Sequence, residues 1–207
     1  MKIGNVSLFF IFFIFVSGAY GHVPSEGKIF GSFGLNIHQV SSINVQDSQS
    51  SPAAIDFGIL GEGDVNNKGG IEFGIFYSSK TYQRTYGNTH LAERIHKLSV
   101  PIGYRYWIIP ALSAGIAFDA SYSMGEAQVI FNNAPVGSDP TSARSITEYG
   151  VDFSTQWEAW SQKRFGILLD ARYFYSLTAK SGEDANQLSL LIGLKYMIQE
   201  KGASPAE

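Results

Sequence analysis

Two histidines and a glutamate are the residues whose types and spacing come nearest to a metal site in this sequence. They form the pattern His90-x-x-Glu93-x-x-His96, and imidazole and carboxylate groups are common metal ligands. In an extended segment, however, this spacing separates the two imidazoles by about 20 Å. They would converge only through a bend, so we expect polar residues of a surface loop here and predict no metal site.

Nucleophilic catalysis and phosphate binding lack their usual sequence patterns. No G-x-S-x-G sequence is present to place a serine on a sharp strand-to-helix turn. Gly58, Gly61 and Gly63 follow a strand-like segment, but no helix pattern follows them, so they predict no phosphate site. His38 stands alone on a predicted strand, which suits a hydrogen-bonded role better than a catalytic one. We therefore expect no catalytic residue and no cofactor.

The composition limits the classes of protein to which the chain can belong. Of its 207 residues 16% are charged, below the roughly 25% of soluble domains, and 22 are glycine. The mean hydropathy of −0.01 excludes a bundle of membrane-spanning helices, and the many aromatic residues argue against disorder. The net charge of −3 gives no support for nucleic-acid binding, and the absence of cysteine excludes disulfides.

Residues 1–19 have the pattern of a secretory signal peptide. Lys2 supplies a positive start, the apolar run LFFIFFIFV covers residues 8–16, and the small residues Ser17, Gly18 and Ala19 follow. The apolar run is too short to cross about 30 Å of hydrocarbon as a helix. We therefore expect cleavage after Ala19 and export of the mature chain.

Behind this segment, apolar and polar residues alternate with a period of two, which is the pattern of β-strands with one apolar face. No segment keeps a helical period of 3.6 residues. Turn-like stretches divide the alternating pattern into separate segments. We expect eight strands, at residues 28–40, 53–62, 70–82, 95–106, 111–124, 146–160, 165–177 and 186–198.

Each predicted strand has one face of large apolar residues and one face of small and charged residues. The interior of an eight-stranded barrel is only just wide enough for side chains, so it cannot hold the large face of every strand. The polar face must therefore point inward and the apolar face toward lipid, with an aromatic girdle near the strand ends. The inward charged residues, which we expect to form a structural network in the lumen, are Asp56, Glu72, Lys80, Lys97, Arg105, Asp119, Glu148, Asp152, Glu158, Asp170, Arg172 and Lys195.

The connections between the predicted strands alternate between long and short, as they do in membrane barrels. With the amino terminus in the periplasm, the outer loops are residues 41–52, 83–94, 125–144 and 179–185, and the inner turns are residues 63–69, 107–110 and 161–164. These features predict an all-β fold over residues 20–198, an eight-stranded antiparallel up-and-down transmembrane β-barrel with a filled polar lumen. Residues 199–207 then form a short periplasmic tail.

The last predicted strand carries the most specific motif of the chain. It reads LSLLIGLKYMI, in which Gly193 is followed by hydrophobic residues at positions 196 and 198. With this motif the chain resembles the small eight-stranded outer-membrane barrels of Gram-negative bacteria, the OmpA/OmpX-like superfamily. The resemblance implies that Gly193, Tyr196 and Ile198 form a signal read by the barrel-insertion machinery. The segment KLSVPIGYRYW, residues 97–107, is similar to the fourth strand of the same group, including its proline.

The resemblance leaves three classes of function open. Inward charges of both signs in near balance favour a salt-bridged plug, and therefore a non-enzymatic structural or surface-interaction protein whose outer loops meet an unidentified surface ligand. A narrow or gated ion channel is the first alternative. A lipid A-modifying enzyme is the second, although neither His38 nor His96 begins the His-x-Ser motif of the deacylase type. The expected partners of the monomer are outer-membrane lipids, lipopolysaccharide and the insertion machinery, without nucleic acid.

Overall fold

A computed structural model describes residues 23–40, 54–135 and 137–200 of the chain. The expected signal peptide, the expected outer loop 41–52 and most of the expected tail lie outside these residues. The elements in chain order are β1 (Ile29–Val40), β2 (Ala54–Asp64), β3 (Gly69–Tyr86), β4 (Thr89–Ile109), β5 (Leu112–Ser123), β6 (Gln128–Asn132), the 3-10 turn η2 (Ser142–Arg144), β7 (Thr147–Gln162), β8 (Phe165–Ser176), β9 (Glu183–Asp184) and β10 (Gln187–Gln199). No helix in the described ranges is long and apolar enough to cross a membrane.

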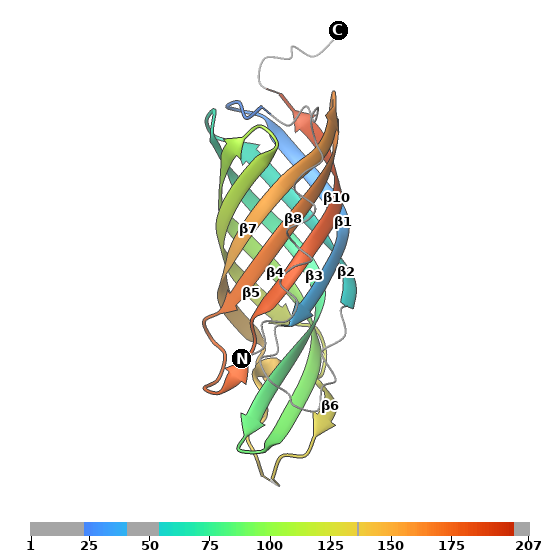
Figure 1. The fold of residues 1–207 in the computed structure, drawn as a ribbon, viewed down its shortest axis with the longest axis vertical. Coiled ribbons are helices and arrows are strands. Elements are labelled where there is room, and N and C mark those ends of the chain that lie inside the picture. Colours follow the sequence, from blue (N-terminus) through green and yellow to red (C-terminus); the bar gives the residue numbers. More distant parts are fainter. Residues whose placement is uncertain (1–22, 41–53, 136, 201–207) are drawn as a thin grey trace, which may run out of the picture.

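Eight of these strands close into one antiparallel barrel, which confirms the predicted fold class (Figure 1). Strands β1, β2, β3, β4, β5, β7, β8 and β10 each pair with the next strand in this order. Strand β10 returns to pair with β1, from Val40 opposite Gln187 to Ile29 opposite Gln199. Because the ring is closed, its wall has no free backbone edge.

The two faces of the barrel wall have the character that the alternation predicts. On β1, Phe33 and Leu35 point outward and are 58% and 57% exposed, whereas Ser32 and Asn36 point inward and are each 3% exposed. The same alternation of exposed and buried residues runs along β7 and β8. Large apolar side chains thus cover the outside, and polar side chains occupy the narrow lumen.

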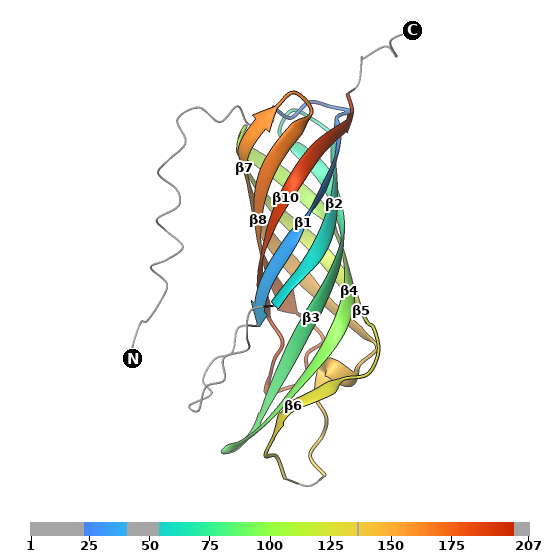
Figure 2. The same cartoon turned by 90° about the vertical axis from the view of Figure 1, so that its right-hand side faces the viewer.

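The segment 83–94, expected to be an outer loop, is instead mostly strand. Strands β3 and β4 continue beyond the barrel as one hairpin and remain paired up to Tyr86 and Thr89. Strand β6 pairs with β4 and the short β9 pairs with β3, so the expected loops 125–144 and 179–185 also contribute strands. The order β9-β3-β4-β6 forms a protruding sheet at this end of the barrel, which we call the outer end, and Figure 2 shows β3, β4 and β6 extending beyond the barrel.

A two-residue turn explains why the hairpin can run so far. Gly87 and Asn88 connect the last pair, and Gly87 has φ +61°. Glycine at the first central position is what a type II′ turn requires, and this turn matches the twist of antiparallel strands. Gly-Asn between two strand-like runs was therefore a readable hairpin signal in the sequence.

The lumen also contains an apolar layer that the polar-inward pattern did not predict. Leu60, Phe76, Leu168 and Leu191 are buried together inside the barrel. A Cβ atom on Gly58 would lie too close to the ring atoms of Phe76. The absence of a side chain at Gly58 therefore provides the space for the Phe76 ring. Small inward residues thus serve here to admit large inward neighbours, and the lumen is filled.

Candidate functional site

The lumen holds a dense group of buried charged side chains, which we call the lumen network. Seven buried acids and five buried bases belong to it. The acids are Glu62, Glu72, Asp119, Glu148, Asp152, Glu158 and Asp170, and the bases are Lys80, Lys97, Arg105, Arg172 and Lys195. Two further buried acids lie outside it: Asp64, which accepts from Ser25 N at the end of β2, and Glu93, which lies in the outer part of β4. The network divides into an inner, a middle and an outer group along the barrel.

The inner group is centred on Glu62 of β2. Lys195 Nζ lies 2.5 Å from Glu62 Oε2, and Gln156 donates a hydrogen bond of 2.6 Å to Glu62 Oε1. The Lys195 ammonium also lies 4.8 Å from the ring centroid of Trp107, a cation–π distance. Below this group, a cavity of about 460 Å³ opens at the inner end and is lined by Lys28, Lys195 and other residues.

The middle group is a quartet of two guanidiniums and two carboxylates. Arg105 Nε donates to Glu72 Oε2 at 2.7 Å, and Arg105 Nη2 lies 2.9 Å from Asp170 Oδ2. Arg172 completes the quartet, with Nε 2.9 Å from Asp170 Oδ1 and Nη2 3.3 Å from Glu72 Oε1. Each charged group therefore faces two of opposite sign, an arrangement that offsets the cost of burial. The quartet occupies the centre of the lumen.

The outer group is built on Glu148 of β7. Lys80 Nζ lies 2.9 Å from each Glu148 oxygen, and Lys97 Nζ lies 3.5 Å from Oε2. Tyr82 donates a hydrogen bond to the same carboxylate, and Ser176 donates another at 2.6 Å. A single carboxylate therefore ties together side chains from β3, β4, β7 and β8.

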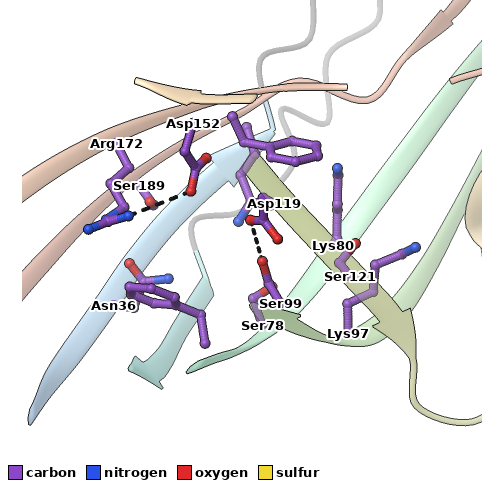
Figure 3. Close-up of a pocket in the computed structure, with 13 residues that line it drawn as sticks. Asn36, Ser78, Lys80, Lys97, Ser99, Asp119, Ser121, Asp152, Arg172 and Ser189 are labelled. Atoms are coloured by element: carbon purple, nitrogen blue, oxygen red, sulfur yellow. Dashed lines mark hydrogen bonds and ion pairs between the residues drawn. The ribbon is translucent and has the colours of Figure 1, made fainter. Parts of the chain in front are cut away.

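A cavity of about 40 Å³ lies between the middle and outer groups. Asp119, Asp152, Asn36, Lys80 and Lys97 are among the residues that line it (Figure 3). Asp119 accepts a hydrogen bond from Ser99, and Asp152 Oδ2 lies 3.6 Å from Arg172 Nη1. Asn36 Oδ1, Asp119 Oδ1 and Lys97 Nζ are buried without a hydrogen-bond partner. The cavity is therefore lined by polar atoms whose bonding capacity is unfilled.

Beyond the outer rim of the barrel, two carboxylates hold a cap over the outer end of the lumen. Glu93 accepts hydrogen bonds from Thr141 N at 2.9 Å and Thr141 Oγ1 at 2.7 Å, and pairs with Arg144 Nη2 at 2.6 Å. Glu183 accepts from Ser142 N at 2.8 Å and Ser142 Oγ at 2.5 Å. The turn η2 is thereby fixed over Tyr82, Ile95 and Ala185, which form an apolar cluster with its Ala143.

The hydrogen bonds of the cap also shift the pKa of Glu93. Burial raises the pKa of Glu93, but the hydrogen bonds from Thr141 and Arg144 outweigh burial and hold the pKa of this carboxyl below its ordinary value. The ionised carboxylate is therefore the form that holds the cap in place.

The structure places eleven of the twelve charged residues predicted for the lumen within the lumen network. The twelfth, Asp56, lies nearer the outer rim, where it accepts a hydrogen bond of 2.8 Å from Ser79 N and faces His38 Nδ1 at 3.6 Å. Sequence reasoning missed Glu62, although this residue shares the inward parity of Leu60. Its position at the very end of the expected strand 53–62 hid that signal.

The residues of the expected insertion signal lie on β10 next to the strand closure. Gly193 stands opposite Gly34 of β1, where β10 closes the barrel. Tyr196 points outward and its ring lies 5.0 Å from that of Phe165. Ile198 is 58% exposed on the same face as Tyr196.

The pattern His90-x-x-Glu93-x-x-His96 is divided between two faces of β4. Glu93 points inward to the cap, whereas His96 is exposed and stacks on Tyr77 with ring centroids 5.5 Å apart. Within the described residues no group of three or more His, Asp or Glu is placed to hold a metal ion. His38 Nε2 lies 2.6 Å from the Ser79 carbonyl oxygen, so this nitrogen is engaged with the backbone.

Comparisons with known proteins bear on the fold. No family model and no curated protein sequence matches the chain. Solved structures with a similar fold include the attachment invasion locus protein Ail of Yersinia pestis, in complex with the heparin analogue sucrose octasulfate, at 14% identity over 83% of this chain and 99% of Ail, with a TM-score of 0.51. They also include the outer membrane protein OprG from Pseudomonas aeruginosa, at 11% identity over 88% of this chain and 100% of OprG, with a TM-score of 0.59. The chain therefore has the fold of the small eight-stranded outer-membrane β-barrels.

Proposed function

We propose that the chain is a non-enzymatic outer-membrane protein that binds a partner outside the cell through its protruding sheet. The observation that carries this proposal is strand β6, in which all five residues are exposed. Val129, Ile130 and Phe131 are 51%, 45% and 50% exposed, beyond the barrel wall. An exposed apolar strand is a liability in a protein without a use for it, and it is a ready surface for recognition.

The filled lumen supports a role at the outer surface rather than conduction of ions along the barrel axis. The middle quartet and the apolar layer occupy the centre, and the cap covers the outer end. The engaged Nε2 of His38 also gives no support to a lipid A-modifying reaction at the outer rim. The rigid barrel then acts as a scaffold that presents the protruding sheet.

The expected location of the protein agrees with this role. A cleaved signal peptide at residues 1–19 would export the chain, and the exposed apolar belt would then be covered by lipid and lipopolysaccharide. Ail, which has a similar fold, is named for attachment and invasion. A polyanion such as the heparin analogue bound in the Ail structure is not the ligand we expect for residues 125–144, because this segment contains a single basic residue, Arg144.

The test compares attachment of cells that express the protein with and without an intact β6. We expect Val129→Ser with Phe131→Ser to reduce binding to host cells or matrix-coated surfaces at least several-fold. The inner-turn variant Lys68→Ser, at the opposite end of the barrel, serves as the control and should bind normally. Fractionation and surface proteolysis must show equal amounts of all variants in the outer membrane. Equal attachment with β6 intact or altered would refute the proposal, and an altered acyl pattern of lipid A in expressing cells would refute its non-enzymatic part.

A further inference from the structure

The charges of the lumen network do not balance. It contains seven buried acids but five buried bases, so fully ionised acids exceed the bases by two. Uncompensated charge is costly inside a protein and must be neutralised by a bound cation or by protons. The network therefore needs positive charge beyond that of its own side chains.

Two of the weakly paired acids of the network lie at one place. Glu62, Glu72, Glu148 and Asp170 each have a lysine or arginine nitrogen within 3 Å. Asp119 has no ion pair within 4 Å among the described residues and is held by the neutral Ser99 hydroxyl. Asp152 Oδ2 lies 3.6 Å from Arg172 Nη1, and the same guanidinium also forms ion pairs with Asp170 and Glu72. Asp119 and Asp152 both lie at the cavity of about 40 Å³, whereas the remaining weakly paired acid, Glu158, shares Lys195 with Glu62 at the inner end, at 3.7 Å.

The cavity also presents oxygen atoms that lack donors. Asn36 and Asp119 are each 3% exposed, and Asn36 Oδ1 and Asp119 Oδ1 have no hydrogen-bond partner. Both residues line the cavity, as do Ser78, Ser99 and Ser121, and Figure 3 shows Ser99 next to Asp119. Unfilled acceptors around a polar cavity indicate an occupant that donates hydrogen bonds to them, as water does, or that binds their lone pairs, as a cation does.

We propose that this cavity is a binding site for a monovalent cation, Na⁺ or K⁺, held by Asp119, Asp152 and Asn36. Such ions are bound by rings of oxygen atoms that replace part of their water shell. The cavity volume of about 40 Å³ admits a small ion and one or two waters, since one water takes roughly 10–15 Å³ of such space. A water on the outer side would accept a hydrogen bond from Lys97 Nζ, which has an ion pair with Glu148 at 3.5 Å but no hydrogen-bond partner.

Charge and ligand count favour a monovalent ion over a divalent one. The described residues contain no group of three or more acids or histidines arranged for a metal ion. Lys80, Lys97 and Arg172 line the same cavity and reduce the negative potential there. One positive charge is therefore sufficient to balance Asp119, whose carboxylate has no ionic partner of its own.

The test is the thermal stability of the full chain, folded in detergent micelles, in different chloride salts at equal ionic strength. We expect the unfolding midpoint to be roughly 2–8 °C higher in sodium or potassium chloride than in choline chloride. Choline is too large for the cavity, so it supplies ionic strength without occupying the site. Asp119→Asn should lose this difference while it keeps an oxygen to accept the Ser99 hydrogen bond. Glu126→Gln, which removes an exposed acid outside the lumen, should retain it.

Equal midpoints of the wild-type protein in all three salts would overturn the proposal and would assign the missing positive charge to protons. If Asp119→Asn does not fold, crystals of the unaltered protein soaked in a thallium(I) salt give an independent answer. An anomalous peak between Asp119 and Asn36 is the expected result. A lumen without such a peak would also overturn the proposal.

Discussion

Lys80 on β3 and Glu148 on β7 meet across the lumen in a two-point ion pair, with Lys80 Nζ 2.9 Å from both carboxylate oxygens. Both side chains are 3% exposed. The strands that carry them are not neighbours in the barrel wall, so the pair braces the barrel across its interior. It also fixes Glu148 for its bonds with Tyr82 and Ser176.

Glu148→Gln should therefore destabilise the barrel strongly. The change leaves two buried lysines without an anion, and removal of one partner from a buried pair costs about 3–5 kcal/mol. Urea unfolding in lipid vesicles measures this loss, with the exposed Glu126→Gln as the matched control. The double variant Lys80→Met with Glu148→Gln should recover part of the stability, and strictly additive losses would contradict the brace.

A second prediction concerns the middle quartet, in which Arg105 bonds to Glu72 and Asp170. The wild-type protein in planar bilayers should show no large, steady conductance. Arg105→Ala removes the largest fully buried side chain and leaves an acidic constriction. We expect this variant to conduct and to select cations. A large steady conductance of the wild-type protein would show that the quartet does not close the lumen.

A third prediction is the pH dependence of the cap. The pKa of Glu93 lies below its ordinary value of 4.5, so its contribution is fully present above that value and is lost as pH falls through the lowered pKa. The Thr141 amide, which donates to Glu93, should show this loss in NMR spectra of the folded protein in micelles. In Glu93→Gln the Thr141 signal should no longer follow that titration. A wild-type signal that is unchanged down to acid pH would contradict the assignment.

Much of the fold could be predicted because the barrel forces a two-residue alternation on every strand. Lipid outside and a narrow lumen inside leave each residue one of two environments, and this is visible in the sequence. The extension of β3 and β4 was missed because its outward face is polar, like that of a loop, although Gly87-Asn88 indicated the turn. The predicted loop boundaries therefore failed where lipid contact ends.

For the lumen, the sequence predicts which residues point inward but not which of them contact one another. Parity shows that Arg105 and Asp170 point inward, but not that they meet, because their strands are separated around the ring. The inward parity of Leu60, Phe76, Leu168 and Leu191 was readable as well. Their role as a common layer depends on the stagger between strands, which a single sequence does not specify.

A fourth prediction concerns the turn of the protruding hairpin. Gly87 has φ +61°, a conformation that costs a residue with a side chain roughly 1–2 kcal/mol. Gly87→Val should therefore loosen the ends of β3 and β4 and leave the barrel intact. Hydrogen exchange should rise at residues 83–92 and stay unchanged in β7 and β8. Asn88→Ala, which alters the other turn residue, should have the smaller effect.

The last prediction tests the packing of Gly58 against Phe76. A Cβ atom on Gly58 would clash with the Phe76 ring, which is 6% exposed and cannot move outward through the barrel wall. Gly58→Ala should therefore cost about 1–3 kcal/mol, as overpacking does in other filled interiors. Urea unfolding and the fraction of heat-modifiable protein both measure this cost.

A compensating change separates a steric clash from a backbone effect. Phe76→Leu shortens the side chain at the point of contact, at its own cost of a cavity in the apolar layer. If the clash is the cause, Gly58→Ala should be less harmful in the Phe76→Leu background than in the wild-type protein. If alanine were unfavourable because of the backbone conformation alone, its cost would be the same in both backgrounds. Equal costs would therefore show that the absence of a side chain at position 58 does not serve to admit Phe76 into the lumen.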